Sequence, residues 1–115
     1  MAGFKINRVT SDIRLALSEL LREIKDPRVS KMLSIIKLDV SGDMSYATVY
    51  VSAIEGVETT KESVKILNKN VSAFLRGELG RRLSLRKVPQ LRFVADNSIE
   101  KSAHISTIID SFNEN

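Results

Sequence analysis

The feature that most constrains the fold is a run of ten uncharged residues, SYATVYVSAI, at positions 45–54. β-Branched and aromatic side chains predominate in this run, and successive side chains alternate in character. One face carries Ala47, Val49 and Val51, and the other carries Tyr46, Thr48 and Tyr50. Alternation with a period of two is typical of a strand. Because edge strands usually carry charged residues, an uncharged strand predicts a central position in a sheet.

Another strand precedes this run. Residues 33–40, LSIIKLDV, fit a strand, and we expect Ile36, Leu38 and Val40 on one of its faces. Residues 41–44, SGDM, supply a turn signal between the two strands. Two strands joined by so short a connection predict an antiparallel hairpin.

Helical patterns flank the hairpin on both sides. Over about residues 7–24, apolar residues recur at steps of three and four, which predicts an amphipathic helix that ends at Asp26-Pro27. After the hairpin, Thr59 and Glu62 have the spacing of a capping box, and a helical pattern then continues to about Leu83. The apolar side chains of its first part are Val64, Leu67, Val71, Phe74 and Leu75.

A third strand is expected at residues 91–95, followed by a turn or cap at residues 96–98 and a short helix over residues 99–109. The predicted order is therefore α-β-β-α-α-β with a short C-terminal helix. A strand that follows another after a long helical crossover pairs with it in parallel, by a right-handed connection. We expect residues 1–115 to form one α+β domain with a three-stranded mixed sheet and helices on one face.

Composition excludes several classes of function. The chain has no cysteine, which excludes disulfides, thiolate-bound zinc and thiol catalysis. Its acidic residues show no spacing typical of a metal site. The one histidine, His104, has no carboxylate or serine spaced to orient it. We therefore expect no catalytic residue, no metal and no cofactor. No apolar run approaches the roughly 20 residues of a membrane span, and no secretory signal is visible, so we expect a cytoplasmic protein.

Positive charge gathers in one segment. Residues 76–92 hold six basic residues and one acid, a local net charge of +5, whereas residues 93–115 have a local net charge of −3. Guanidinium groups bind phosphate through paired donors, so this asymmetry predicts one cationic face for a nucleic acid. The alternative is a solvated helix surface. We expect phosphate contacts from Arg76, Arg81, Arg82, Arg86 and Lys87, with Arg28 and Arg8 as secondary contacts.

Two of these predictions have alternatives that the sequence leaves open. Arg76 could instead pack its aliphatic stem against a neighbouring helix. Arg92, on the third strand, could pair with an acid. We expect Tyr46 and Tyr50 to pack in a layer rather than to stack on bases, so base specificity should be low.

The basic segment contains a literal GxxG, Gly77-Glu78-Leu79-Gly80. In KH domains a GxxG joins two helices and clamps a nucleic-acid backbone. A junction at this place would leave only residues 81–85 for the second helix, which is too short to be stable. We therefore place the helix kink at Val71, Ser72 and Ala73, with both glycines inside the second helix. Each glycine there costs up to about 1 kcal/mol relative to alanine.

Several segments together resemble the ribosome-binding factor A family: REIKDPRVS, YATVYVS and FLRGELGRRLSLRKVPQLRFVADNS. The resemblance extends over about residues 6–109. It implies a type II KH-like fold in which GxxG is replaced by a helix–kink–helix carrying Ala-x-Gly. That pattern falls on Val71-Ser72-Ala73, where valine and alanine occupy the outer positions.

The resemblance also implies a function. Members of this family are non-enzymatic assembly factors that bind the free small (30S) ribosomal subunit and its 16S rRNA. They promote late maturation, including processing of the 16S rRNA 5′ end, and matter most in the cold. The resemblance implies a cytoplasmic monomer with no cofactor, membrane or small-molecule substrate.

Two alternatives belong to other classes. One is a protein-interaction adaptor without direct RNA binding, whose apolar first helix docks a partner. The other is a small α+β hydrolase, whose activity would be lost in His104→Ala.

Overall fold

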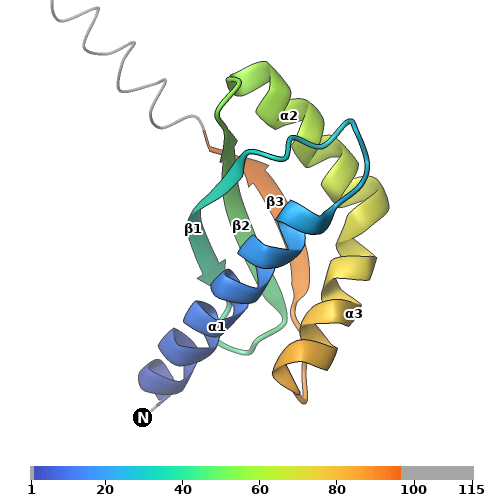
Figure 1. Ribbon diagram of the computed structural model, residues 1–115. Coiled ribbons are helices and arrows are strands. Elements are labelled where there is room, and N and C mark those ends of the chain that lie inside the picture. The colour runs from blue at the N-terminus through green and yellow to red at the C-terminus, as the bar shows by residue number, and fades with distance from the viewer. Residues whose placement is uncertain (1, 97–115) are drawn as a thin grey trace, which may run out of the picture.

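The computed structural model describes residues 2–96, and in the first helix it describes side chains from Arg8 onward. The C-terminal helix expected from the sequence, residues 97–98 of the turn or cap before it, and His104 lie outside these residues. Figure 1 shows the arrangement of the elements. In chain order they are α1 (Ala2–Glu23), β1 (Leu33–Val40), β2 (Tyr46–Ala53), α2 (Val57–Ile66), the π-helical segment η1 (Leu67–Val71), α3 (Ser72–Leu83) and β3 (Gln90–Ala95). None of these helices is both long and apolar enough to cross a bilayer.

The three strands form one mixed sheet in the order β1-β2-β3. β2 pairs antiparallel with β1, from Leu33 opposite Ala53 to Val40 opposite Ala47. β2 also pairs in parallel with β3, from Tyr46 opposite Gln90. The predicted topology and the central place of β2 are confirmed.

The core lies between one face of this sheet and the helices. In Figure 1, α1 crosses in front of the sheet, and α2 and α3 run beside it. Alternate residues of β2 are buried on this face, including Val49 and Val51, and they belong to one cluster with Leu17 of α1 and Leu75 of α3. Each such side chain, when fully buried, stabilises the fold by about 1.5–3 kcal/mol. This burial fixes α3 beside the sheet.

The face expected for β1 was wrong at Ile36. The pairing shifts between Ile35 and Lys37: Ile35 lies opposite Val51, and Lys37 lies opposite the next residue, Tyr50. An extra residue in one strand reverses the faces on either side of it. Ile35 is consequently buried, whereas Ile36 is 36% exposed.

The start of α2 also differs from the expectation. The helix begins at Val57, after Gly56 with φ 121°, so Thr59 lies inside the first turn and does not cap it. Thr60 has the structural role instead. Its hydroxyl donates to the Gly56 carbonyl at 2.7 Å and accepts from the Ala53 N–H at 2.8 Å. These bonds fix the corner between β2 and α2.

Two aromatic residues expected to pack are exposed. Phe74 is 59% exposed, because η1 inserts a wider turn that rotates the apolar face onto Leu75. Tyr46 is 60% exposed, because it lies on the face of β2 opposite the helices.

Candidate nucleic-acid interface

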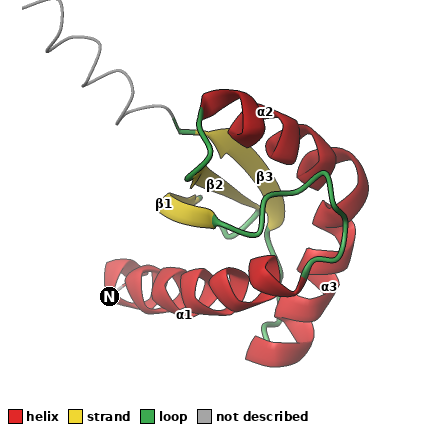
Figure 2. Cartoon of the chain, turned by 45° about the horizontal axis from the view of Figure 1, so that its top comes forward, coloured by secondary structure: helices red, strands yellow, loops and turns green. Residues whose placement is uncertain are grey.

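The helical run after the hairpin changes direction at η1, as Figure 2 shows. The π-helical turn ends at Val71, and α3 starts at Ser72. The segment chosen for the kink therefore lies at the boundary between the two helix types. Both glycines of the GxxG lie inside α3, as expected.

Polar side chains join this boundary to β3. The Asn68 amide donates to the Phe93 carbonyl at 2.9 Å and accepts from the Phe93 N–H at 2.8 Å. The Ser72 hydroxyl lies 3.4 Å from the Leu91 carbonyl. These contacts hold the start of α3 against the outer edge of β3.

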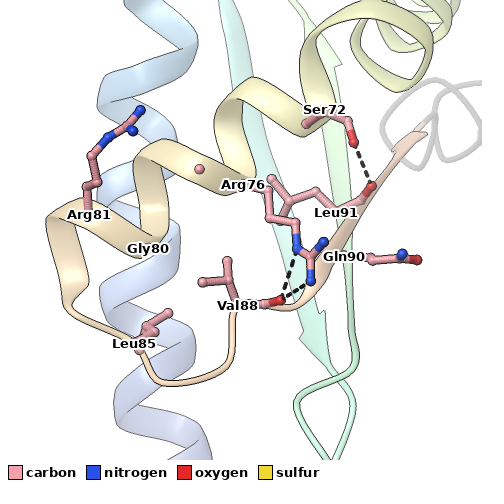
Figure 3. Close-up of a pocket in the computed structure, with 10 residues that line it drawn as sticks. Ser72, Arg76, Gly80, Arg81, Leu85, Val88, Gln90 and Leu91 are labelled. Carbon is pink, nitrogen blue, oxygen red and sulfur yellow. Dashed lines mark hydrogen bonds between the residues drawn. The ribbon is translucent and has the colours of Figure 1, made fainter.

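Beyond this junction an open groove of about 810 Å³ lies between α3 and β3 (Figure 3). Its third side is the segment that connects the two elements, residues 84–89. The lining residues are Ser72, Ala73, Arg76, Gly77, Gly80, Arg81, Leu85, Val88, Gln90 and Leu91. The groove therefore has cationic, apolar and bare-backbone surfaces side by side.

Arg76 lies in the middle of the groove (Figure 3). Its Nε and Nη2 donate to the main-chain carbonyl of Val88 at 3.1 and 3.0 Å. A carbonyl carries no net charge, so the positive charge of Arg76 is not neutralised by this contact. Of the five N–H groups of a guanidinium, three remain for a ligand.

Arg81 also lines the groove, with 70% of its side chain exposed. It forms an ion pair with Glu78, one turn earlier on α3. An anionic ligand would compete with Glu78 for this guanidinium. An exposed pair of this kind is worth little, so the competition costs little free energy.

Arg82 points to another neighbour. Its Nη1 lies 3.3 Å from Glu19 Oε2 and its Nη2 lies 3.3 Å from Glu23 Oε2, both on α1. Arg82 does not line the groove. The sequence grouped it with the phosphate contacts, but the structure places it as a link between α1 and α3.

Lys87 and Arg86 lie on the connecting segment. The Lys87 ammonium donates to the Asp43 carbonyl and to the Ser45 hydroxyl, both at 3.1 Å. These bonds fasten the segment to the β1–β2 turn. Arg86 is exposed, with no hydrogen bond or ion pair to any described side chain. Arg86 and Lys87 place two positive charges beside the groove.

The turn that holds Lys87 is itself stabilised by a carboxylate. The N–H of Ser45 donates to Asp43 Oδ1 at 3.0 Å, and the Ser41 hydroxyl donates to the same atom at 2.8 Å. These hydrogen bonds, the Ser45 N–H first, lower the pKa of Asp43 to about 2. The carboxylate is therefore charged at neutral pH.

The two secondary contacts lie apart from the groove. Arg28 binds Asp26 through Nε at 3.1 Å and Nη2 at 2.8 Å. This side-chain hydrogen bonding, with the Arg28 N–H, lowers the pKa of Asp26 to about 2. Arg8 is exposed on α1. Neither residue lines the groove.

Sequence reasoning missed the second wall of the groove, although it placed Gly77 and Gly80 inside the second helix. Together with Ala73 they are spaced four and three residues apart, which puts them on one side of a helix. That spacing was readable in the sequence. The facing residues Val88 and Gln90 could not be found, because their approach depends on how α3 packs on β3.

The described residues contain no group of three or more histidine, cysteine, aspartate or glutamate side chains placed to hold a metal ion. Arg76 and Arg81 make the groove suited to binding an anion.

Comparison with known proteins identifies relatives. A family profile described as ribosome-binding factor A matches residues 5–109. Ribosome-binding factor A of Methylobacillus flagellatus is 49% identical over 105 residues, which cover 90% of this chain and 81% of that protein.

Solved structures that resemble this chain carry the same family description. The solution NMR structure of a Thermotoga maritima protein, a putative ribosome binding factor A, is 36% identical with a TM-score of 0.70, over 82% of this chain and 89% of that one. The Thermus thermophilus ribosome binding factor A, as a homology model fitted into the cryo-EM map of a complex with 30S, is 27% identical with a TM-score of 0.65. That match covers 78% of this chain and 93% of the other. With the family profile spanning nearly all of its length, the chain belongs to the ribosome-binding factor A family.

Proposed function

We propose that this protein is a non-enzymatic assembly factor that binds the free small ribosomal subunit. In this proposal, 16S rRNA binds in the groove between α3 and β3. The observation that carries the proposal is the pair of guanidinium groups, Arg76 and Arg81, that line the groove. The Thermus thermophilus relative was fitted into the map of a complex with 30S, which supports the same partner here.

The distribution of charge supports RNA as the direct ligand. Arg76 keeps its full charge beside a neutral carbonyl, and Arg86 and Lys87 add two charges at the connecting segment. Phosphate groups are recognised by such paired and clustered donors. Arg82 is left out of this set because two carboxylates of α1 already hold it.

The adaptor alternative has less support. It needs an apolar face of α1 that is free for a partner. The apolar stripe of α1 instead packs into the core: Ile13 and Leu17 are fully buried, and Val9 is partly buried against the same cluster. Among the described side chains of this helix, Leu15 is the large apolar residue that remains exposed.

Family membership supports finer parts of the proposal. We propose that binding promotes late maturation of the subunit, including processing of the 16S rRNA 5′ end, and matters most in the cold. We also propose that the chain acts as a cytoplasmic monomer in a single KH-like domain, with η1 and the start of α3 in the place of a GxxG loop.

Co-sedimentation tests the proposal. The full chain is incubated with purified small subunits, large subunits and whole ribosomes, and the bound fraction is measured at several salt concentrations. We expect binding to small subunits that weakens steeply with salt, because bound phosphates release counterions. Binding to large subunits alone, or binding independent of salt, would contradict the proposal.

A further inference from the structure

The face of the sheet that points away from the helices carries both tyrosines of the chain, Tyr46 and Tyr50. They alternate along β2 with the buried core residues, so they share this face. Since α1 crosses in front of the sheet in Figure 1, this face is turned away from the viewer there. The register of the strands places eight side chains on it, here called the open face: Lys37, Asp39, Tyr46, Thr48, Tyr50, Gln90, Arg92 and Val94.

Tyr46 presents an uncovered ring on a firmly held main chain. The residue is 60% exposed, although it begins the central strand. Its N–H donates to the Ser41 hydroxyl at 3.0 Å, and its carbonyl accepts from the Ser41 N–H at 2.8 Å. Within residues 2–96 its ring takes part in no ring contact. Tyr50 differs, because the Lys37 ammonium lies 5.8 Å from the centre of its ring.

Arg92 supplies a positive charge that nothing on the open face offsets. It is exposed on β3, and it forms no hydrogen bond or ion pair within residues 2–96. The acid on this face, Asp39, lies 3.6 Å from the Lys37 ammonium. The charges of Asp39 and Lys37 therefore offset each other, and Arg92 leaves the open face cationic.

Arg92 also lies between the two tyrosines. It is opposite Thr48, which separates Tyr46 from Tyr50 on β2. At about 3.3 Å per residue and about 4.8 Å between strands, the Cα atom of Arg92 lies about 8 Å from that of either tyrosine. This spacing lets a tyrosine stack on a base while the guanidinium binds an adjoining phosphate.

The open face continues into the groove. Gln90 lies opposite Tyr46 on the open face, and it also lines the groove. In Figure 3 its side chain points away from α3. RNA that leaves the groove over Gln90 therefore reaches Tyr46 next. Exposed tyrosines also suit a protein partner, but a cation without an acidic partner, next to a cationic groove, favours a polyanion.

We infer that the open face is a second RNA-binding surface, on which an unpaired base stacks on Tyr46 while Arg92 binds a phosphate. This inference takes its ligand, the rRNA of the small subunit, from the proposed function. It places the contact outside the groove, on side chains that take no part in groove binding. Stacking on a tyrosine tolerates any base, so this surface adds affinity without base specificity.

Tyrosine fluorescence tests the inference directly. The chain has no tryptophan, so all of this emission comes from Tyr46 and Tyr50 of the open face. The probe is an oligouridylate of about 12 nucleotides, titrated into the full chain, with correction for absorption by the RNA. We expect the emission to fall as the oligouridylate binds, because a stacked base quenches a tyrosine. Emission that stays unchanged throughout the titration would overturn the inference.

A double variant tests the same surface on purified small subunits. Tyr46→Thr with Arg92→Gln removes the ring and the charge but keeps a strand-forming residue at position 46. The matched control, Phe74→Ala with Arg22→Gln, removes a helix aromatic that is 59% exposed and an exposed helix cation. We expect the double variant to lose about tenfold or more in affinity and the control to stay within about twofold of the parent.

Two single variants separate the ring from the charge. Tyr46→Phe keeps the ring, so it should bind subunits within about twofold of the parent. Arg92→Gln should reduce the slope of log affinity for oligouridylate against log salt by about 0.7, the value for one phosphate contact on a single strand. An unchanged slope would contradict the role given to Arg92.

The outcomes separate this inference from the proposed function. If the double variant is folded and binds small subunits like the parent, the open face binds no RNA, although the proposed function stands. If it loses subunit affinity while oligouridylate leaves the parent's emission unchanged, a protein of the subunit covers the open face and the inference is wrong. If it does not fold, quenching in the parent decides. If the parent fails to bind small subunits, the proposed function itself is contradicted.

Discussion

Arg76 on α3 and Val88, twelve residues later, are joined by two hydrogen bonds from one guanidinium group to one carbonyl oxygen, at 3.1 and 3.0 Å. This contact sets the distance between α3 and the connecting segment. It also orients the remaining N–H groups of Arg76. The groove is therefore shaped by one of the residues that we propose to bind its ligand.

Two substitutions of Arg76 should distinguish the contribution of its charge to subunit binding from the contribution of its planar pair of donors. Arg76→Lys keeps the charge but loses the planar pair of donors, so we expect weaker subunit binding with an unchanged salt dependence. Arg76→Ala should reduce the slope of log affinity against log salt by about 0.7–0.9, the value for one lost phosphate contact. Affinities measured at several salt concentrations check both. If the slope of log affinity against log salt is the same in Arg76→Ala as in the parent, Arg76 contacts no phosphate.

Arg82 should matter for stability rather than for RNA. Its contacts with Glu19 and Glu23 lie at the surface, where ion pairs contribute up to about 1 kcal/mol. We expect Arg82→Ala to lower the free energy of unfolding by no more than this and to leave subunit affinity within about twofold. A double-mutant cycle with Glu23→Ala, followed by denaturant unfolding, measures the coupling. A fall in the salt slope like that of Arg76→Ala would instead place Arg82 on the RNA.

The contact between Asp26 and Arg28 predicts a specific acid dependence. Hydrogen bonds from Arg28 lower the pKa of Asp26 from 3.8 to about 2. The unfolded chain therefore binds this proton more readily, and the contribution to stability is complete above pH 3.8 and lost as the pH falls towards 2. The difference in unfolding free energy between the parent and Asp26→Asn should shrink over this window. A difference that stays constant there would contradict the assignment.

Substitution of Gly80 by alanine should not stabilise the protein. Alanine normally stabilises a helix relative to glycine, but at position 80 its Cβ would press on Val88 Cγ2. We expect Gly80→Ala to have a Tm no higher than that of the parent, measured by thermal unfolding. A clear rise in Tm would mean that the connecting segment moves aside at no cost, and that the groove is less rigid than described.

Much of the fold could be predicted because its signals are local. The alternation in residues 45–54 and the length of the helical run after them determine a central strand and a parallel crossover. The errors in the predicted fold came from two features that the sequence pattern does not show: the register in which β1 pairs with β2, and the extra residue of a π-helical turn. A shift in pairing turned Ile36 outward, and a π-helical turn turned Phe74 outward.

The site was harder to predict than the fold. The charge of the segment 76–92 could be read directly, but not the partners of each side chain. Arg82 lies 59 residues from Glu23 in sequence, so only the packing of α1 on α3 reveals their contact. The same holds for the groove, since its two walls come from α3 and β3.

The most direct test of the central claim is subunit binding by a double variant, Arg81→Glu with Arg86→Glu. Its matched control is Lys61→Glu with Lys65→Glu, which changes the net charge equally at exposed positions of α2 outside the groove. Thermal unfolding confirms that both are folded. We predict that the groove variant loses affinity for small subunits by about a hundredfold or more while the control stays within about threefold. Equal affinity of the groove variant and the parent would contradict the claim that 16S rRNA binds between α3 and β3.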